Sequence, residues 1–487
     1  MLTASNDIGA VKSEVLYEVA KLAFEGSLAE KQEALPYEMI PGPHAYFRCC
    51  VYKEREIIRQ RIRMAQGLSP INSEQSTRLI QVIPSACEGC PITRFVVTDN
   101  CQKCMAKKCK NACNFDAISM LRDRAYIDST KCKECGRCAQ ACPYNAIADL
   151  MRPCKRSCPV DAISMDDNGI CSIDETKCIN CGNCIKNCPF GAISDRSSIV
   201  DVIKLLKSSK QVYAMVAPAI EGQFGAEVNV GMISEALKEL GFTGMYEVAL
   251  GADLVSMSET EEWAEAYKEG KKLTTSCCPA FVNMIHKHFP ALLKHISTTI
   301  SPMHMTARII RELHPGAVTV FIGPCIAKKD EAGAQKSEGN ADYVLTFEEL
   351  HAMFRARDIN LAAYSETMQQ STIYGKNYAV SGGVTKAVMQ SLKEKSIDAS
   401  DIQINVCNGA AECKKALMLL RAGKLPEDFI EGMACIGGCV EGPGNHLTGR
   451  AAQLNRQKLL SAADTSKNIS DIVEAHKELP LSTHHEA

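Results

Sequence analysis

An excess of charge of one sign, a long apolar run and a secretory leader are all missing from this 487-residue sequence. The formal net charge is only −2, so we expect neither a nucleic acid nor a membrane surface as a partner. No apolar run approaches the ~20 residues that span a bilayer. The N-terminus lacks a basic segment followed by an apolar one, so it does not resemble a secretory signal. These absences predict a soluble, cytoplasmic protein.

Cysteine, in contrast, is abundant: the chain contains 26. Small secreted domains use cysteines for disulfides because their hydrophobic cores are too small to stabilise them. A chain of this length is expected to form about two to four domains, each with a core of its own, so it does not need such disulfides. In a reducing cytosol such a density of thiols more often means metal ligation. The spacing of the cysteines therefore has to identify the sites.

The chain divides into four regions. Residues 81–195 contain 17 of the 26 cysteines and a recurring Cys-Pro-x-x-Ala-Ile sequence. Residues 1–80 contain stretches with apolar residues at three- and four-residue steps, which predict a helical segment. Residues 196–450 have the alternating pattern of an α/β domain, and residues 451–487 are mostly polar, with a docked helix and a loose end expected there. In the α/β region we predict strands over 211–220, 317–325 and 377–383, and helices over 231–241 and 385–395.

Two complete copies of a bacterial ferredoxin half-motif, Cys-x2-Cys-x2-Cys-x3-Cys-Pro, stand in the cysteine-rich region. In this motif a tight loop delivers three thiolates to one [4Fe-4S] cluster, and the fourth cysteine ligates the neighbouring cluster. The copies are Cys132, Cys135, Cys138 and Cys142, and Cys178, Cys181, Cys184 and Cys188.

A variant half-motif with a longer gap precedes the first copy and consists of Cys101, Cys104, Cys109 and Cys113. Together the two halves predict an inner two-cluster module over about residues 95–150. Its predicted ligand sets are Cys101, Cys104, Cys109 and Cys142 for one cluster, and Cys132, Cys135, Cys138 and Cys113 for the other.

The second complete copy needs a partner, of which Cys154 and Cys158 supply only the end. We interpret Cys87 and Cys90 as the missing pair, so that the inner module is inserted in a loop of the outer one. The alternatives for this pair are a zinc site or surface thiols. The predicted sets are Cys178, Cys181, Cys184 and Cys158, and Cys87, Cys90, Cys154 and Cys188; Cys49, Cys50, Cys171, Cys407 and Cys413 remain as buried or idle thiols.

The resulting four clusters would act as an electron wire. The half-motifs, including the one with a long loop, resemble the electron-transfer subunits of molybdenum oxidoreductases. Because such clusters make no bonds themselves, a site that supplies or consumes electrons is expected at one end.

Three cysteine-bearing loops without ferredoxin spacing follow: TSCCPAF over 275–281, GPCIAKKDE over 323–331 and EGMACIGGCVEGPG over 431–444. Each contains small residues that let the backbone approach a bulky inorganic group. Four thiolates from these loops would make a further cubane site, and Lys328 would place a cation beside it.

In this order the three loops resemble the signatures of [FeFe]-hydrogenases, over roughly residues 85–450. The short size, the absence of tryptophan from TSCCPAF and the inserted module are similar to the monomeric group B branch. The resemblance implies two α/β lobes with an H-cluster between them, a [4Fe-4S] cubane joined to a diiron subsite that carries CO, cyanide and azadithiolate. It implies these residues: Cys278, Cys325, Cys435 and Cys439 as cubane ligands, Cys439 bridging to the diiron subsite, Lys328 on a cyanide, and Ala217, Pro218 and Met433 lining the pocket.

A proton relay is implied as well. The thiol of Cys277, directly before the first ligand, would pass protons to Glu259, Ser297 and Glu262 in turn. Taken alone, the two glutamates could be a solvated helix face and Ser297 a helix cap.

Several positions depart from the family pattern. Gly323 stands where a methionine is usual, and Met303 and His304 replace two glutamines. The glycine triplet after Cys439 reads Gly-Pro-Gly over residues 442–444. Such changes around a metal tune its potential. His304 could be a proton donor or a ligand, but a structural role is expected, and Lys329 is expected to be solvated.

The resemblance implies an enzyme of anaerobic hydrogen metabolism that interconverts protons, electrons and H2 with a soluble ferredoxin, after hydrogenase maturation proteins have built the H-cluster. An H2 sensor with slow turnover is the alternative. A non-hydrogenase iron–sulfur protein, like the eukaryotic cluster-assembly relatives, is a third reading. We expect the cluster with Cys178 to be nearest the catalytic site.

Overall fold

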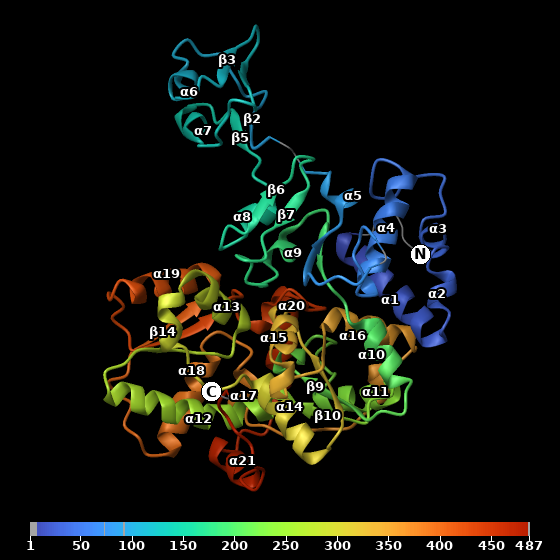
Figure 1. Cartoon of the computed structure of the whole chain (residues 1–487), viewed down its shortest axis with the longest axis vertical. Coiled ribbons are helices and arrows are strands. Elements are labelled where there is room, and N and C mark those ends of the chain that lie inside the picture. Colours follow the sequence, from blue (N-terminus) through green and yellow to red (C-terminus); the bar gives the residue numbers. More distant parts are fainter. Residues whose placement is uncertain (1–6, 73, 91–92, 486–487) are drawn as a thin grey trace.

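The computed structural model describes residues 7–72, 74–90 and 93–485 (Figure 1). Small antiparallel strand pairs are stacked above a larger body of parallel strands and helices, and the N-terminal helices lie beside them. Within the described part of the chain, no helix is long and apolar enough to cross a membrane.

The N-terminal helices are docked onto the α/β body. The first helix begins at Asp7, whose carboxylate accepts a hydrogen bond from the Ala10 amide, and ends at Gly26 in the left-handed conformation. Its apolar face, which includes Val11, Val15 and Val19, is buried against two helices of the body. The elements are α1 (Ile8–Glu25), α2 (Leu28–Lys31), α3 (Leu35–Met39), α4 (Val51–Ala65), and the body helices α10 (Ile199–Leu206) and α16 (Phe347–Ala356).

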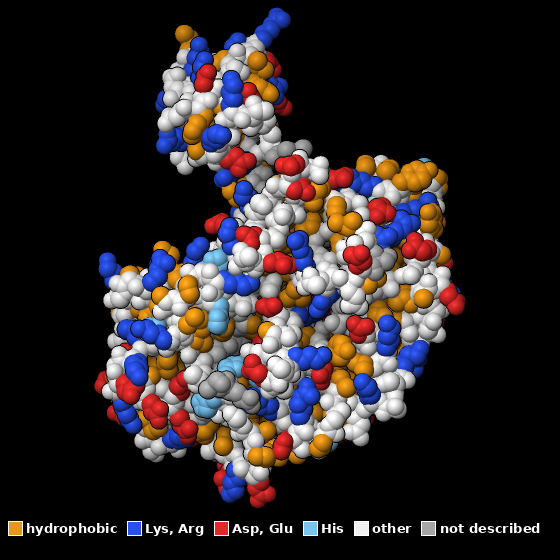
Figure 2. All heavy atoms as spheres, viewed as in Figure 1, with side chains coloured by type: hydrophobic (Ala, Val, Ile, Leu, Met, Phe, Trp, Pro, Cys, Tyr) orange, Lys and Arg blue, Asp and Glu red, His pale blue; other side chains and the backbone are white. Residues whose placement is uncertain are grey.

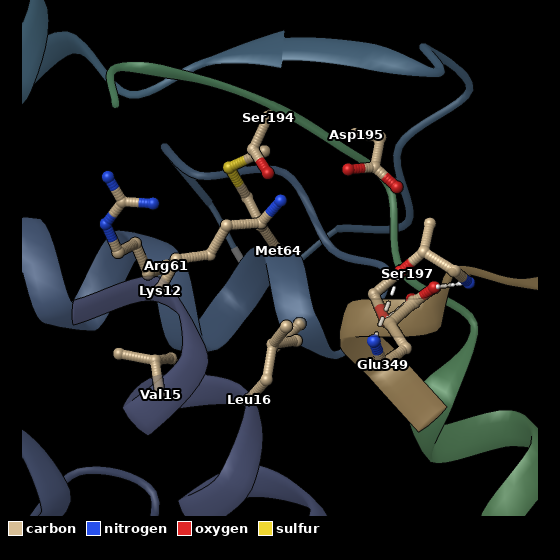
Figure 3. Close-up of a pocket in the computed structure, with 11 residues that line it drawn as sticks. Lys12, Val15, Leu16, Arg61, Met64, Ser194, Asp195, Ser197 and Glu349 are labelled. Atoms are coloured by element: carbon tan, nitrogen blue, oxygen red, sulfur yellow. Dashed lines mark hydrogen bonds between the residues drawn. The ribbon is translucent and has the colours of Figure 1, made fainter. Parts of the chain in front are cut away.

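A buried ion-pair cluster joins the end of the cysteine-rich region to the α/β body. Lys329 Nζ lies 2.7 Å from Asp195 Oδ2 and 3.2 Å from Glu349 Oε2, with all three side chains almost fully buried. Figure 3 shows Asp195 and Glu349 around the adjoining pocket, which Lys12 and Arg61 also line. The prediction that Lys329 is solvated is therefore wrong, because carboxylates from two distant segments enclose it.

The cysteine-rich region consists of four short antiparallel strand pairs in a nested order. The first and last strands of the inner module pair with one another, and so do the first and last strands of the outer one. Figure 1 shows the inner module projecting away from the body. The pairs are β1 (Ile80–Val82) with β8 (Ile193–Asp195), β2 (Phe95–Val97) with β5 (Ile147–Asp149), β3 (Ile118–Met120) with β4 (Ala125–Ile127), and β6 (Ile163–Met165) with β7 (Cys171–Ile173).

The α/β body contains two parallel sheets. The first has the order β10-β9-β12-β13 and contains two of the predicted strands; the second has the order β11-β15-β14. Buried side chains cover every position of β9 and β15, as expected for strands packed on both faces. The strands are β9 (Val212–Val216), β10 (Gly244–Glu247), β11 (Leu273–Thr274), β12 (Val318–Ile322), β13 (Tyr343–Leu345), β14 (Ile404–Asn408) and β15 (Phe429–Met433).

The predicted strand over 377–383 is wrong. These residues form turns between two helices, α17 (Ile373–Asn377) and α18 (Gly383–Glu394). Gly382 has φ +83°, and a Cβ on Gly383 would lie 1.9 Å from the Asn377 oxygen, so the Gly-Gly pair makes a tight corner instead of a strand.

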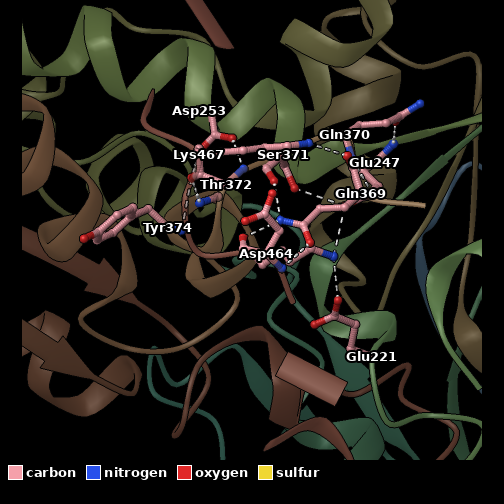
Figure 4. Close-up of polar contacts among 12 residues, drawn as sticks. Glu221, Glu247, Asp253, Gln369, Gln370, Ser371, Thr372, Tyr374, Asp464 and Lys467 are labelled. Carbon is pink, nitrogen blue, oxygen red and sulfur yellow. Dashed lines mark hydrogen bonds and ion pairs between the residues drawn. The ribbon is translucent and has the colours of Figure 1, made fainter. Parts of the chain in front are cut away.

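Helix α12 (Val248–Lys268), which carries Glu259 and Glu262, is fixed by polar contacts to residues 369–374 (Figure 4). Asp253 accepts hydrogen bonds from the Thr372 amide and hydroxyl at 2.7 and 2.6 Å. Burial raises the pKa of Asp253 to about 6. Further helices of the second half of the chain are α11 (Val230–Leu240), α13 (Pro279–His288), α14 (Pro302–Leu313), α15 (Ala327–Ala334), α20 (Gly449–Ser461) and α21 (Ile469–Ala475).

Candidate metal centre

Four loops that carry predicted site residues leave the carboxyl ends of parallel strands. Residues 217–218 follow β9 and residues 323–325 follow β12 in one sheet. Residues 275–278 follow β11 and residues 434–439 follow β15 in the other. Ligand sites in open α/β sheets lie at this edge. The convergence of distant cysteines is thus a consequence of the strand order.

The thiols of Cys278, Cys325, Cys435 and Cys439 come together between the two sheets. Burial, and then the nearness of Cys278, raises the pKa of Cys325 to about 12. Burial raises the pKa of Cys435 and Cys439 even further, and Cys325 and Cys278 add to both shifts. All 26 cysteines are free. Raised pKa values mean that these crowded, unbridged thiols keep their protons when no cation is present. The iron of a cubane supplies the positive charge that stabilises four thiolates, so the arrangement fits an iron–sulfur cluster.

A cavity adjoins three of these thiols, those of Cys278, Cys325 and Cys439, and its wall is mostly apolar. Ala217, Pro218 and Met433 line it together with Cys277 and Lys328, as the sequence predicts. This cavity leaves room for an inorganic group next to Cys439. Phe321 and Tyr378 also line the cavity, and the sequence did not identify either of them as a site residue. Met303 lines it too, although the sequence singled it out only as a departure from the family pattern.

Lys328 is held in place by an acidic partner. Its Nζ lies 2.6 Å from Glu331 Oε2, and both side chains are about nine-tenths buried. Ser301 donates a hydrogen bond to the other carboxylate oxygen of Glu331. The ammonium group therefore faces the cavity with its orientation fixed. Glu331 is the last residue of the loop 323–331 that the sequence singled out. Its ion pair with Lys328 became apparent only in the structure.

The four predicted relay residues form two neighbouring pairs, Cys277 with Glu259 and Ser297 with Glu262, and the two glutamates are close enough to influence one another. Cys277 is close to Glu259, which is buried and has one carboxylate oxygen without a hydrogen-bond partner in the described chain. Burial, with a smaller contribution from Glu262, raises the pKa of Glu259 to about 8. Ser297 donates a hydrogen bond to Glu262 Oε2. The solvated-face alternative does not apply to Glu259, since it is only 2% exposed.

The inner module brings together all four cysteines of one predicted set and three of the other, whose ligand roles stay predictions. Cys101, Cys104, Cys109 and Cys142 line one small pocket. In the other set, burial is the main cause that raises the pKa of Cys138. Cys132 and Cys113 are close enough to Cys138 to raise this pKa further.

The outer module also follows the predicted sets. Burial raises the pKa of Cys184 strongly, and Cys181, Cys178 and Cys158 add to the shift. Burial, with Cys188, Cys87 and Cys154 as smaller contributors, raises the pKa of Cys90. The split pair Cys87–Cys90 therefore meets its partners as the nested arrangement requires. Its role as a ligand pair stays a prediction.

The recurring Cys-Pro-x-x-Ala sequence has a local structural reason. The amides of Ala146, Ala162 and Ala192 each donate a hydrogen bond to the sulfur of the cysteine four residues earlier, at 3.4, 3.3 and 3.2 Å. An N–H directed at sulfur stabilises the thiolate form of a ligand.

Cys171 was expected to be idle, but it lies beside one of these sets. Its amide donates to Cys87 Sγ at 3.3 Å, and its thiol interacts with Cys154. Arg152 Nη1 lies 3.8 Å from Cys87 Sγ, so a cation accompanies this set.

The set with Cys178 borders the four thiols between the two sheets. Cys178 and Cys181 belong to the same apolar cluster as Cys278 and Cys325. Lys287 donates to the Cys178 oxygen at 2.7 Å. This placement agrees with the expectation that the Cys178 cluster is proximal.

The departures from the family pattern have structural counterparts. A Cβ at Gly323 would lie 2.5 Å from the Phe321 ring, which lines the cavity. His304 is buried, and its Nε2 lies 3.0 Å from the Glu338 backbone oxygen, so a structural role accounts for it.

Family models match three parts of the chain. The model of the iron-only hydrogenase large subunit, C-terminal domain, matches residues 210–443. A 4Fe-4S binding domain matches residues 125–148, and the LdpA Fe-S cluster-binding domain matches residues 148–199.

Relatives and one solved structure agree with these matches. The periplasmic [Fe] hydrogenase large subunit of Nitratidesulfovibrio vulgaris is 31% identical over 65% of this chain and 85% of its own. Iron hydrogenase 1 of Clostridium pasteurianum is 29% identical, and the match covers 65% of this chain but only 64% of that enzyme. The cytosolic Fe-S cluster assembly factor NAR1 of Kluyveromyces lactis is 26% identical over 42% of this chain and 59% of its own. A structure of an oxygen-inactivated [FeFe]-hydrogenase shares the fold with a TM-score of 0.50, at 23% identity over 60% of this chain and 97% of that one.

The thiol arrangement, the domain matches and the similarity to the periplasmic enzyme lead to one conclusion. The chain is an iron–sulfur protein and belongs to the [FeFe]-hydrogenase family.

Proposed function

We propose that this protein catalyses reversible H2 oxidation and proton reduction at an H-cluster held by Cys278, Cys325, Cys435 and Cys439. The main support is one cavity that Cys278, Cys325 and Cys439 border and that Cys277 and Lys328 also face. Cys435 lies close to these three cubane thiols. The diiron unit supplies, when bound, the metal position for H2 and a pendant base for its proton. The two parallel sheets would be the two lobes that enclose it.

The protein's own residues would position ligands and move protons. Lys328, oriented by Glu331, offers charged N–H groups to an anionic ligand, and such a bond contributes about 1.5–3 kcal/mol. Cys277 carries protons between the cavity and Glu259. From Glu259 they pass through Ser297 to Glu262, which is half-buried at the protein surface. The apolar cavity wall keeps bulk water away from this transfer.

Electrons would travel through four [4Fe-4S] clusters in the region 81–195. The proposed order runs from the inner module through the Cys87 and Cys178 sets to the catalytic cubane. The region 1–80 would brace this chain of clusters, since α1 packs on the body. The catalytic domain would comprise residues 196–450, followed by a tail over 451–487.

The inner module has the properties of a docking site for an acidic electron carrier such as a soluble ferredoxin. Residues 95–150 contain nine lysine or arginine and six aspartate or glutamate residues, a net charge of +3. Met105 and Phe115 are 97% and 44% exposed, and Figure 2 shows basic and apolar side chains intermingled on this module. Maturation proteins would be the second class of partner, and the cytoplasm the location.

The test is to mature the purified protein with the diiron subsite and assay H2 evolution from a reduced donor. We expect turnover in the wild type and none in Cys278→Ala, with infrared bands of CO and cyanide only in the former. Turnover no higher than in Cys278→Ala would refute the proposal.

A role like that of the NAR1 cluster-assembly factor is the second candidate, because NAR1 is similar over 42% of the chain. Cys277 and Lys328 at the cavity favour the hydrogenase. Bound iron without any CO or cyanide bands after maturation would favour the assembly role.

A further inference from the structure

The end of the described chain lies across the outer end of the proton relay. The amide of Ile300 donates to the Thr483 oxygen at 2.9 Å, and the amide of His485 donates to the Thr298 oxygen at 3.1 Å. Arg308 Nη1 donates to the Ser482 oxygen at 2.6 Å. The expected loose end is thus bound to the segment that also carries Ser297.

This docking gives the imidazole of His484 two hydroxyl partners. Its Nδ1 lies 2.8 Å from Thr298 Oγ1, and its Nε2 lies 3.1 Å from Ser258 Oγ. The Thr298 hydroxyl is 3.1 Å from Glu262 Oε1. Thr298 and His484 are exposed, whereas Glu262 is partly covered. A continuous series of polar groups therefore connects the last predicted relay residue to the solvent.

We propose that His484 is the outer station of the proton relay, exchanging protons between Glu262 and solvent through the Thr298 hydroxyl. The inference rests on the proposed hydrogenase function. In the outward direction, the Thr298 oxygen accepts the proton from Glu262 while its own hydrogen moves to Nδ1 of His484, and the proton on Nε2 leaves to water. Thr298 and His484 then have the same number of protons as before, after tautomer exchange of the imidazole, whereas Glu262 has lost one proton to water and takes the next one from Ser297. Inward transfer reverses these steps.

The charged surroundings suit an imidazole that cycles between its two forms. Glu262 faces it through Thr298, and Arg308 Nη1 lies 3.3 Å from its backbone oxygen. Ser258 contributes a neutral hydroxyl. The neighbouring His485 is directed elsewhere, with Nδ1 3.2 Å from Glu338 Oε2. Direct exchange of protons between Glu262 and water is the competing route.

His484→Gln and His485→Gln form a matched pair, since both keep the backbone contacts of the tail. We expect His484→Gln to lower H2 turnover about tenfold, less than the 10²–10⁴ of a group at the reacting atoms, and to alter the pH profile. His485→Gln should behave like the wild type. Added imidazole should restore turnover in His484→Ala but leave His485→Ala unchanged. Equal turnover and pH profiles in the matched pair, or no rescue, would overturn the proposal.

A second readout does not use turnover. In protein that lacks the diiron subsite, the ¹⁵N resonance of His484 Nδ1 should shift on Glu262→Gln, while the resonances of His485 stay in place. An unchanged His484 resonance would also overturn the proposal. If the wild type itself fails to evolve H2, the proposed function fails; if it turns over and the His484 variants match it, only the outlet fails.

Discussion

Gly182 packs directly on Pro443: a Cβ at Gly182 would lie 2.5 Å from Pro443 Cγ. Gly182 directly follows Cys181, a proposed ligand of the proximal cluster, and Pro443 lies four residues after Cys439, a proposed cubane ligand. Lys186 adds a hydrogen bond to the Glu441 backbone oxygen at 3.1 Å. The glycine thereby permits the close approach of the two loops that carry these proposed ligands.

Gly182→Ala should therefore separate the two centres. Its φ of +75° costs an alanine about 1–2 kcal/mol, and the Pro443 contact adds a steric cost. We expect a lower melting temperature and slower reduction of the catalytic cubane in freeze-quench EPR. Gly270→Ala is the control, because Gly270 has φ +66° and open space around its Cβ position. Equal effects of the two substitutions would contradict this account of the contact.

Glu259 should be protonated at neutral pH. Burial raises its pKa from 4.5 to about 8, so the folded state binds a proton that the unfolded state has lost. The free energy of unfolding should consequently decrease as the pH rises from 4.5 through about 8. Glu259→Gln should flatten this dependence in thermal melts and remove a carboxylic-acid infrared band that titrates near pH 8 in the wild type. A wild-type band that is already absent at pH 6 would argue against this assignment.

Cys277→Ala should decrease turnover without removing the metal. The thiol carries protons but is not one of the proposed ligands, so we expect a loss of about 100-fold or more, with iron content and CO and cyanide bands retained. Cys413→Ala is the matched control, since Cys413 is fully buried and its thiol lies 3.6 Å from the Met433 oxygen. Turnover of Cys277→Ala at the level of the control would exclude the thiol from proton transfer.

Lys329→Met should destabilise the fold strongly. The substitution leaves Asp195 and Glu349 buried without the cation that contacts both directly, although Lys12 remains nearby. Breaking a buried pair costs about 3–5 kcal/mol. The melting temperature should fall and partly recover when Asp195→Asn is added. Lys477→Met, in an exposed pair with Glu474, should change little. A melting temperature of Lys329→Met that matches Lys477→Met would show that the cluster is not stabilising.

Reversing charge on the inner module should weaken the use of an acidic carrier. Lys107, Lys108 and Lys110 are exposed beside Cys109, and their triple change to glutamate should raise KM for ferredoxin at least about tenfold. Turnover with a small dye donor should stay unchanged, and the salt dependence should decrease. The control reverses three exposed lysines elsewhere, Lys271, Lys393 and Lys477. Equal KM values in the two triple variants would place docking on another surface.

The sequence was most informative where ligand spacing is local. The half-motifs around Cys132 and Cys178 predicted which thiols meet, and nesting extended the prediction to Cys87 and Cys90, because a cluster needs four ligands. Contacts across the fold were not predictable in this way. Asp195 lies 134 residues before Lys329 in the sequence, and Glu349 lies on another helix, α16. No local sequence pattern therefore indicated that Lys329 is buried.

The tail was unpredictable for a related reason. Residues 482–485 are polar and lack periodicity, and their place depends on backbone hydrogen bonds with residues 298–300. The error over 377–383 is different, since the apolar run suggested a strand while Gly382 and Gly383 required a turn.

Because β2 and β5 are paired, the inner module leaves and rejoins the rest of the chain at neighbouring points. A segment joined in this way behaves as a cassette: it can be exchanged without shifting the residues on either side. Selection can then alter this unit alone, while the α/β body is inherited intact.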